Sequence, residues 1–200
     1  NTEGDGGHPL IPHLLEPLDE HSKDSVDNSL ELFERHAESP MPTSADYRAA
    51  YQNQTLTPQQ IGELVISKTS ESEAASPALR AMIAQNATDI EKQALASTQR
   101  WAQGNPIGPL DGVPIAIKDE LDVVPYGTTV GTSFLGRIAA TEDAFAVARL
   151  RDAGALIIGK ANMHELGLGV TGINPHHGAA RNPYAPDHAT GGSSSGSAAA

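Results

Sequence analysis

The stretch Gly112-Val113-Pro114-Ile115-Ala116-Ile117-Lys118-Asp119 contains a short apolar run bounded by a glycine and by two polar residues. A run of this length with such ends predicts a buried β-strand over 113–117. Because alternate side chains of a strand point to opposite faces, Pro114, Ala116 and Lys118 share one face. Lys118 therefore leaves the strand at its polar end.

A second apolar run, 155–159, predicts another buried strand. The intervening residues 142–153 have acids at their start and arginines near their end, and Gly154 follows as a stop, which predicts a helix. A strand, a crossover and a strand in this order favour parallel pairing and an α/β layer architecture.

Two further helices are predicted upstream of these strands. Thr57-Pro58-Gln59-Gln60 is typical of a helix N-terminus, with Pro at the first helical position. Thr88-Asp89-Ile90-Glu91 has the spacing of a capping box and predicts a helix that runs to about Gln103 and ends at Gly104. The segment 77–86 between them is apolar but short, and it is left unassigned.

The N-terminal part of the chain is strongly acidic. Residues 1–40 carry ten acidic and two basic residues, a net charge of -8 out of -12 for the whole chain. We divide the chain into an acidic extension, 1–44, partly disordered or helical, and a domain from 45 to 200. Residues 27–38 could form an amphipathic helix that packs on a core or, as an alternative, meets lipid or a partner.

The acidic balance argues against a nucleic-acid partner and against attraction to an anionic membrane surface. Cysteine is absent, so a thiolate nucleophile and Cys-based metal sites are excluded. The histidines lack the spacing of a metal site, and 167–172 has dinucleotide-type glycine spacing in the wrong context. We therefore expect no metal and no cofactor.

No apolar run approaches the ~20 residues of a membrane-spanning helix, and the N-terminus is unlike a signal peptide. The cellular location is left open: a soluble, intracellular protein is favoured over peripheral membrane association, and a homodimer is also left open. Because the chain lacks an initiator Met and stops inside a Ser/Ala run, we interpret it as a fragment.

Two features could carry chemistry. Lys118 in this setting is ordinarily solvated or ion-paired, but burial would disfavour the charged ammonium, and a neutral lysine can act as a base. The segment Gly191-Gly192-Ser193-Ser194-Ser195-Gly196-Ser197 is typical of a flexible linker. It also precedes what reads as the first turn of a helix, where glycines expose backbone N–H groups and hydroxyls can relay protons.

Several ordered blocks resemble the amidase signature family, and the chain is most similar to its plant-type fatty acid amide hydrolase branch. The blocks are 45–51, 108–119, 159–166, 181–183 and 190–199. The resemblance implies the amidase signature fold, an α/β fold in which a mixed β-sheet has helices on both faces. This chain would hold its N-terminal portion, truncated before the nucleophile.

The resemblance also implies a Ser-cisSer-Lys triad. Lys118 matches the family's lysine, and Ser193 matches the bridging serine that is held on a cis peptide. Gly191, Gly192, Ser194 and Met163 are expected at the substrate. The family's serine nucleophile lies downstream, so no residue here is assigned to that role.

The expected activity is hydrolysis of a small-molecule amide, with fatty acid amides or N-acylethanolamines as the leading substrate class. An alternative within the family is a general small-amide or aryl-amide hydrolase, and another, disfavoured by the acidic extension, is the amidotransferase subunit that acts on charged transfer RNA. The alternative from a different class is a non-catalytic binding protein whose Gly/Ser loop holds an anion.

Overall fold

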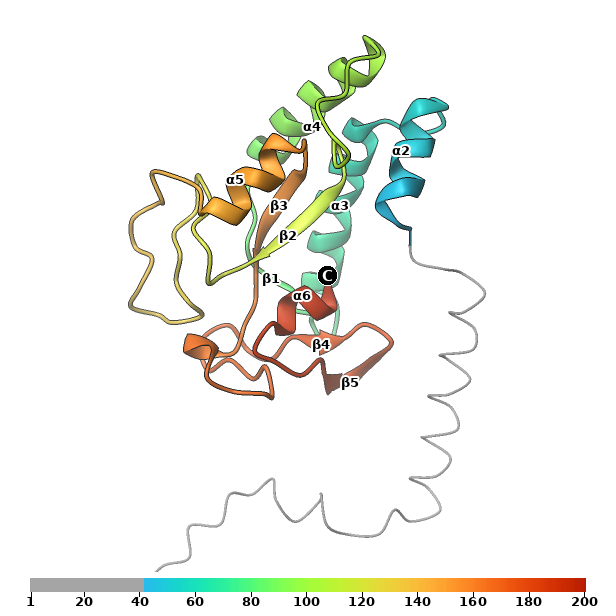
Figure 1. Cartoon of the computed structure of the whole chain (residues 1–200). Helices are drawn as coiled ribbons and strands as arrows, with labels where there is room; N and C mark the ends of the chain where they lie inside the picture. The colour runs from blue at the N-terminus through green and yellow to red at the C-terminus, as the bar shows by residue number, and fades with distance from the viewer. Residues whose placement is uncertain (1–41) are drawn as a thin grey trace, which may run out of the picture. The chain divides into compact units, whose positions relative to one another are not determined.

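The computed structural model describes residues 42–200, which contain a three-stranded mixed sheet in the order β1-β3-β2 (Figure 1). Strand β2 (Pro114–Lys118) pairs in parallel with β3 (Leu156–Ala161), as the two apolar runs predict. Strand β1 (Met82–Ala84) pairs antiparallel with β3. It lies in the segment that the sequence left unassigned. The expected acidic extension, except for its last three residues, and its helix over 27–38 lie outside the described residues.

Helices α3 (Pro58–Ala74) and α4 (Ala87–Ala102) confirm the two helices predicted before β2. The capping box at Thr57 is present, because its side chain accepts from the backbone of Gln60 and the Gln60 side chain accepts in return. The cap predicted at Thr88 is wrong. Asn86 caps α4 instead, because its side-chain oxygen accepts from the Asp89 backbone N–H at 3.1 Å, so the helix starts one residue before Thr88.

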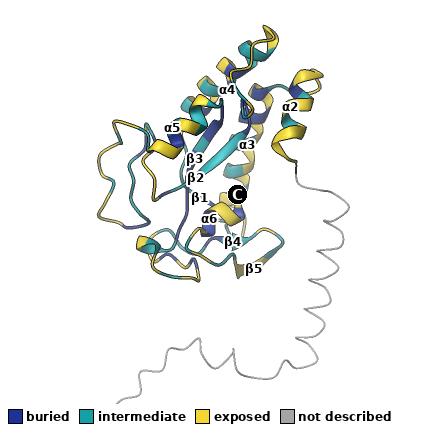
Figure 2. Cartoon of the chain, in the orientation of Figure 1, coloured by how far each residue is buried: buried dark blue, intermediate teal, exposed yellow. Residues whose placement is uncertain are grey.

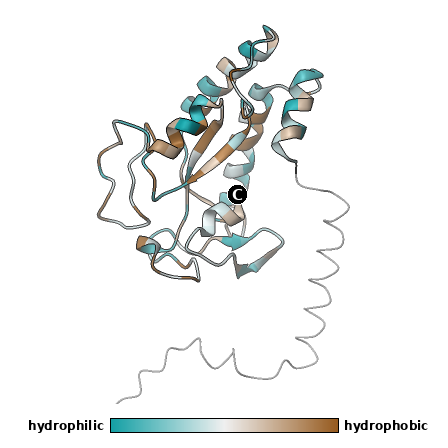
Figure 3. Cartoon of the chain, viewed as in Figure 1, coloured by the Kyte–Doolittle hydropathy of each residue, from teal (hydrophilic) through white to brown (hydrophobic). Residues whose placement is uncertain are grey.

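Helix α5 (Phe145–Asp152) confirms the predicted crossover helix, but it begins three residues later than 142. Adjacent residues of β3 contribute to different apolar clusters on the two faces of the sheet. Ile157 packs in a cluster with Val147 of α5, whereas Leu156 packs with Ile90 of α4. Helices therefore cover both faces of the sheet, as the fold expectation states. Strand β3 is mostly buried, whereas β2 is mostly intermediate and buries only Ile117 (Figure 2). The same strands form the hydrophobic centre in Figure 3.

Helix α2 (Ser44–Gln52) is attached to the start of β2 by one side chain. The Tyr51 hydroxyl donates to the carbonyl oxygen of Gly112 at 2.8 Å and is buried. Its ring also lies 5.6 Å from that of Trp101, centroid to centroid. Tyr51 thus connects α2 to the strand that ends at Lys118.

The remaining elements follow β3 and surround the Gly/Ser segment. They are the 3-10 helix η2 (Glu165–Gly167), the hairpin of β4 (Arg181–Asn182) and β5 (Ala185–Ala189), and helix α6 (Ser195–Ala199). The helical turn expected from residue 197 is present and starts at Ser195. Within residues 42–200, no helix has both the length and the apolar character that crossing a membrane requires.

Candidate active site

Lys118 and Ser193 are in direct contact although 75 positions separate them in the sequence. The Lys118 ammonium nitrogen Nζ donates to Ser193 Oγ at 2.8 Å. Lys118 is the last residue of β2, and its side chain is 18% exposed. The end of a core strand thus delivers a largely buried amine to the hydroxyl that follows the two glycines.

The turn that carries Ser193 packs against the loop after η2 and against His164, the residue just before η2. The Gly192–Ser193 peptide bond is cis, and the Ser193 carbonyl accepts from the His164 backbone N–H at 2.9 Å. A Cβ added to Gly192 would come within 2.6 Å of the Gly172 backbone nitrogen, so these two segments of the chain pack backbone against backbone. This contact explains the glycine at 192 as a close approach of two loops.

The turn after Lys118 is fixed by a buried ion pair. Lys160 Nζ lies 3.0 Å from Asp119 Oδ1, and both side chains are completely shielded from solvent. Lys160 Nζ also donates to the Leu121 carbonyl at 2.7 Å and to Thr128 Oγ1 at 3.0 Å. All three of its donors are therefore used.

Asp119 is equally well satisfied. Its carboxylate accepts from the backbone N–H groups of Thr129 and Gly131, both at 3.1 Å, and from the Thr129 hydroxyl. Its own backbone N–H donates to Ala161 at 3.1 Å, which continues the β2–β3 pairing past Lys118. A charged group can be buried when it is paired and its oxygen atoms have hydrogen-bond donors.

A second carboxylate lies at the candidate site itself. Glu120 Oε2 is 3.0 Å from Lys118 Nζ, and the Glu120 side chain is 47% exposed. The sequence analysis assigned no role to Glu120, Asp119 or Lys160. The Lys-x-Glu spacing at a strand end was the only available signal, and it is shared by many solvated surface pairs.

The other residues expected at the substrate differ in position and exposure. Gly191 and Gly192 form the turn before Ser193, and Gly191 has a positive φ of 80°. Ser194 is exposed at the N-cap of α6 and makes no side-chain capping bond. The Met163 side chain is completely buried within residues 42–200. A role for Met163 at the substrate stays a prediction.

The histidines of this region do not form a metal site. His176 Nε2 lies 2.9 Å from Glu165 Oε1, and within the described part of the chain no three His, Asp or Glu side chains are grouped to hold an ion. His177 Nε2 is buried with no hydrogen-bond partner. Burial lowers the pKa of His177, the charge of Asp119 acts in the opposite direction, and His176 adds to the lowering.

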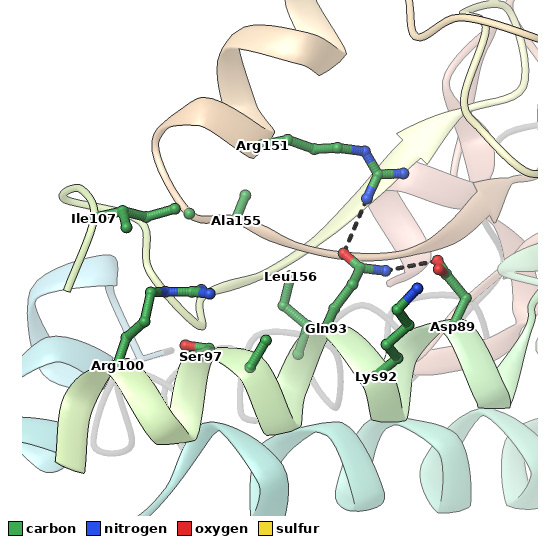
Figure 4. Close-up of a pocket in the computed structure, with 11 residues that line it drawn as sticks. Asp89, Lys92, Gln93, Ser97, Arg100, Ile107, Arg151, Ala155 and Leu156 are labelled. Atoms are coloured by element: carbon green, nitrogen blue, oxygen red, sulfur yellow. Dashed lines mark hydrogen bonds between the residues drawn. The ribbon is translucent and has the colours of Figure 1, made fainter. Parts of the chain in front are cut away.

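A pocket of about 330 Å³ lies between α4 and the segment that joins α5 to β3, and it contains neither Lys118 nor Ser193 (Figure 4). A chain of hydrogen bonds crosses its wall, from Arg151 to Gln93 at 3.1 Å and from Gln93 to Asp89 at 2.7 Å. Arg100, also at the wall, is paired with the buried carboxylate of Asp111 at 2.6 Å. These polar groups already bind one another.

Comparison with known proteins gives a consistent set of relatives. A family model described as Amidase matches residues 63–200. The fatty acid amide hydrolase of Oryza sativa subsp. indica is 52% identical over 155 residues, and that of Arabidopsis thaliana is 46% identical over the same length. Each match covers 77% of this chain and 26% of the relative. The chain thus spans about a quarter of the length of these curated relatives.

A similar solved structure is the native peptide amidase from Stenotrophomonas maltophilia, with a TM-score of 0.71 and 33% sequence identity. The match covers 76% of this chain and 32% of the peptide amidase chain.

Proposed function

Since the chain belongs to the amidase signature family, we propose that it supplies the base and the bridging serine of an amide hydrolase with a Ser-cisSer-Lys relay. The observation that carries this proposal is the 2.8 Å hydrogen bond between Lys118 Nζ and Ser193 Oγ. A base and a hydroxyl at this distance can exchange a proton without further movement.

In the proposed mechanism the neutral amine of Lys118 takes the proton of the Ser193 hydroxyl. Ser193 takes a proton in turn from a nucleophilic serine, a role to which no residue of this sequence is assigned. The nucleophile then attacks the amide carbonyl, and the relay returns the proton to the nitrogen of the departing amine. Water hydrolyses the resulting ester by the same route, which restores the serine and releases the carboxylic acid.

The relay is needed because a serine hydroxyl alone is a weak nucleophile near neutral pH. General acid and base assistance contributes roughly 10²- to 10⁴-fold to such reactions. Lys118 and Ser193 form one route for the proton, so neither is expected to retain much of this contribution without the other.

We propose fatty acid amides or N-acylethanolamines as the substrate class. The relatives named fatty acid amide hydrolase support this class, and so does the surface beside the relay. The loop that backs the Ser193 turn exposes two large apolar side chains, Leu168 and Val170, which are 84% and 82% exposed. Apolar surface next to the reacting groups favours an acyl chain over a charged or small polar substrate.

The test measures kcat/KM of the full-length protein on a long-chain fatty acid amide and on a small aryl amide. We expect at least a tenfold preference for the long chain, and we expect Leu168→Ser to lower kcat/KM for that substrate alone. Leu64→Ser is the control, because Leu64 is also exposed but lies on α3. A preference for the aryl amide would instead support the general-amidase alternative.

A fluorophosphonate probe tests catalysis independently of the substrate, because it labels an activated serine. Labelling that is lost in Lys118→Ala supports the relay. A folded full-length protein that is not labelled would support the non-catalytic alternative, in which the Gly/Ser loop only binds.

A further inference from the structure

We propose that Glu120 is a positioning residue whose carboxylate holds the Lys118 amine beside Ser193. This inference rests on the proposed function for its catalytic meaning. Its physical content is the contact between the Glu120 carboxylate and the Lys118 amine, at 3.0 Å.

Lys118 Nζ has two partners with different consequences. Ser193 Oγ, at 2.8 Å, is the group that Lys118 must deprotonate. Glu120 Oε2, at 3.0 Å, is a negative charge that favours the ammonium over the neutral amine.

Glu120 is the charged side chain within ion-pair distance of Lys118 among residues 42–200. The other charged side chains nearby have ion-pair partners of their own. Asp119 faces Lys160, and Glu165 faces His176. The ring of His164 lies 3.4 Å from the Thr171 hydroxyl. Removing the Glu120 charge therefore leaves Lys118 without an ion-pair partner among residues 42–200.

The other oxygen of the Glu120 carboxylate lies next to Gly167. A Cβ added to Gly167 would lie 3.0 Å from Glu120 Oε1, and Gly167 has a positive φ of 70°. The glycine at the end of η2 thus leaves room for the carboxylate between this helix and Lys118.

Loss of the charge should have two opposite effects on catalysis. The neutral amine becomes available at lower pH, so the acid limb of the kcat/KM profile moves to lower pH. The contact with residue 120 also weakens from an ion pair to a neutral hydrogen bond, so the amine is held less firmly against Ser193 and the plateau rate falls. A residue with a merely structural role would lower the plateau without moving the limb.

The experiment uses the full-length protein with Glu120→Gln, and with Asp122→Asn as the matched control. Asp122 is an exposed carboxylate two residues further along, and no ion pair joins it to Lys118. Competitive labelling of Lys118 with acetic anhydride, read by mass spectrometry across pH, measures how much neutral amine is present. This readout does not depend on catalysis.

We expect the labelling midpoint of Glu120→Gln to fall by at least about half a pH unit, roughly a threefold change in available amine. Asp122→Asn should match the wild type, and Glu120→Asp, which keeps the charge, should return toward it. Coincident labelling curves for Glu120→Gln and the wild type would overturn the inference. If the labelling midpoint shifts in Glu120→Gln but the wild-type protein hydrolyses no amide, the proposed function is overturned and the pairing is not.

Discussion

The carboxylate of Asp119 and the ammonium of Lys160 form an ion pair of 3.0 Å from which solvent is completely excluded. The pair joins the turn after β2 to the penultimate residue of β3, and Asp119 is the immediate neighbour of Lys118. The direction in which Lys118 leaves the sheet therefore depends on a charge pair that does not itself touch Ser193.

Lys160→Met is expected to destabilise the protein strongly, because it leaves Asp119 as a buried charge without its counter-charge. Breaking one side of a buried pair costs about 3–5 kcal/mol in free energy of unfolding. Urea-induced unfolding measures this loss. Lys68→Met is the control, since Lys68 pairs with Glu71 on the exposed surface of α3 and should change little.

The double variant Lys160→Met with Asp119→Leu should be less destabilised than Lys160→Met alone, because it removes both charges together. If the single variant unfolded at the wild-type urea concentration, the pair would have no part in holding this turn.

Gly172→Ala is expected to lower activity by displacing the Ser193 turn. A Cβ at residue 172 would collide with the Gly191 carbonyl oxygen and with Ser195 Cβ, and Gly172 has a φ of 68°. Gly104→Ala is a closely matched control, because Gly104 has a φ of 70° and no atom within 4 Å of an added Cβ. Both variants carry the same cost of a left-handed alanine, and only the first has the collision.

Comparing kcat of the two variants at equal concentrations of folded protein separates the effect of the collision from the cost of a left-handed alanine. We expect a loss of at least about tenfold for Gly172→Ala relative to Gly104→Ala, since small displacements of a catalytic group have large effects on rate. Equal activity in the two variants would show that this loop contact does not position Ser193.

The stability of the protein should fall as the pH drops below the ordinary pKa of histidine, about 6.5. Burial lowers the pKa of His177, so below that value the unfolded chain takes up a proton that the folded chain resists. The contribution of His177 is therefore complete above about pH 6.5 and is lost as the pH falls toward the lowered value.

His177→Gln should flatten this part of the stability profile, measured by urea unfolding between pH 7.5 and 5. His188→Gln, at an exposed position on β5, should leave the profile unchanged. A wild-type profile without any slope in this range would contradict the burial argument.

The strands and most helices could be predicted because their signals are local. The runs 113–117 and 155–159 are apolar and bounded by turn residues, and both became strands within a residue or two. The start of α4 was misplaced because Asn86 and Thr88 are both good N-caps, and sequence alone does not decide which side chain turns toward the helix. Strand β1 has only three residues and exists through its pairing with β3.

The site was predictable only in part. The pairing of Lys118 with Ser193 came from the family resemblance, because no local pattern links residues 75 positions apart. Glu120 and the Asp119–Lys160 pair were missed since their contacts depend on how the turn after β2 folds back on β3. The roles assigned to Ser194 and Met163 remain predictions.

The most direct test of the central claim, that Lys118 and Ser193 relay a proton as a unit, is a double-mutant cycle on amide turnover. The full-length protein is assayed as wild type, Lys118→Ala, Ser193→Ala and the double variant. We predict that each single variant loses at least about 100-fold in kcat and that the double variant is no slower than the worse single within a fewfold. Near wild-type turnover in either single variant, or losses that multiply in the double, would contradict the relay.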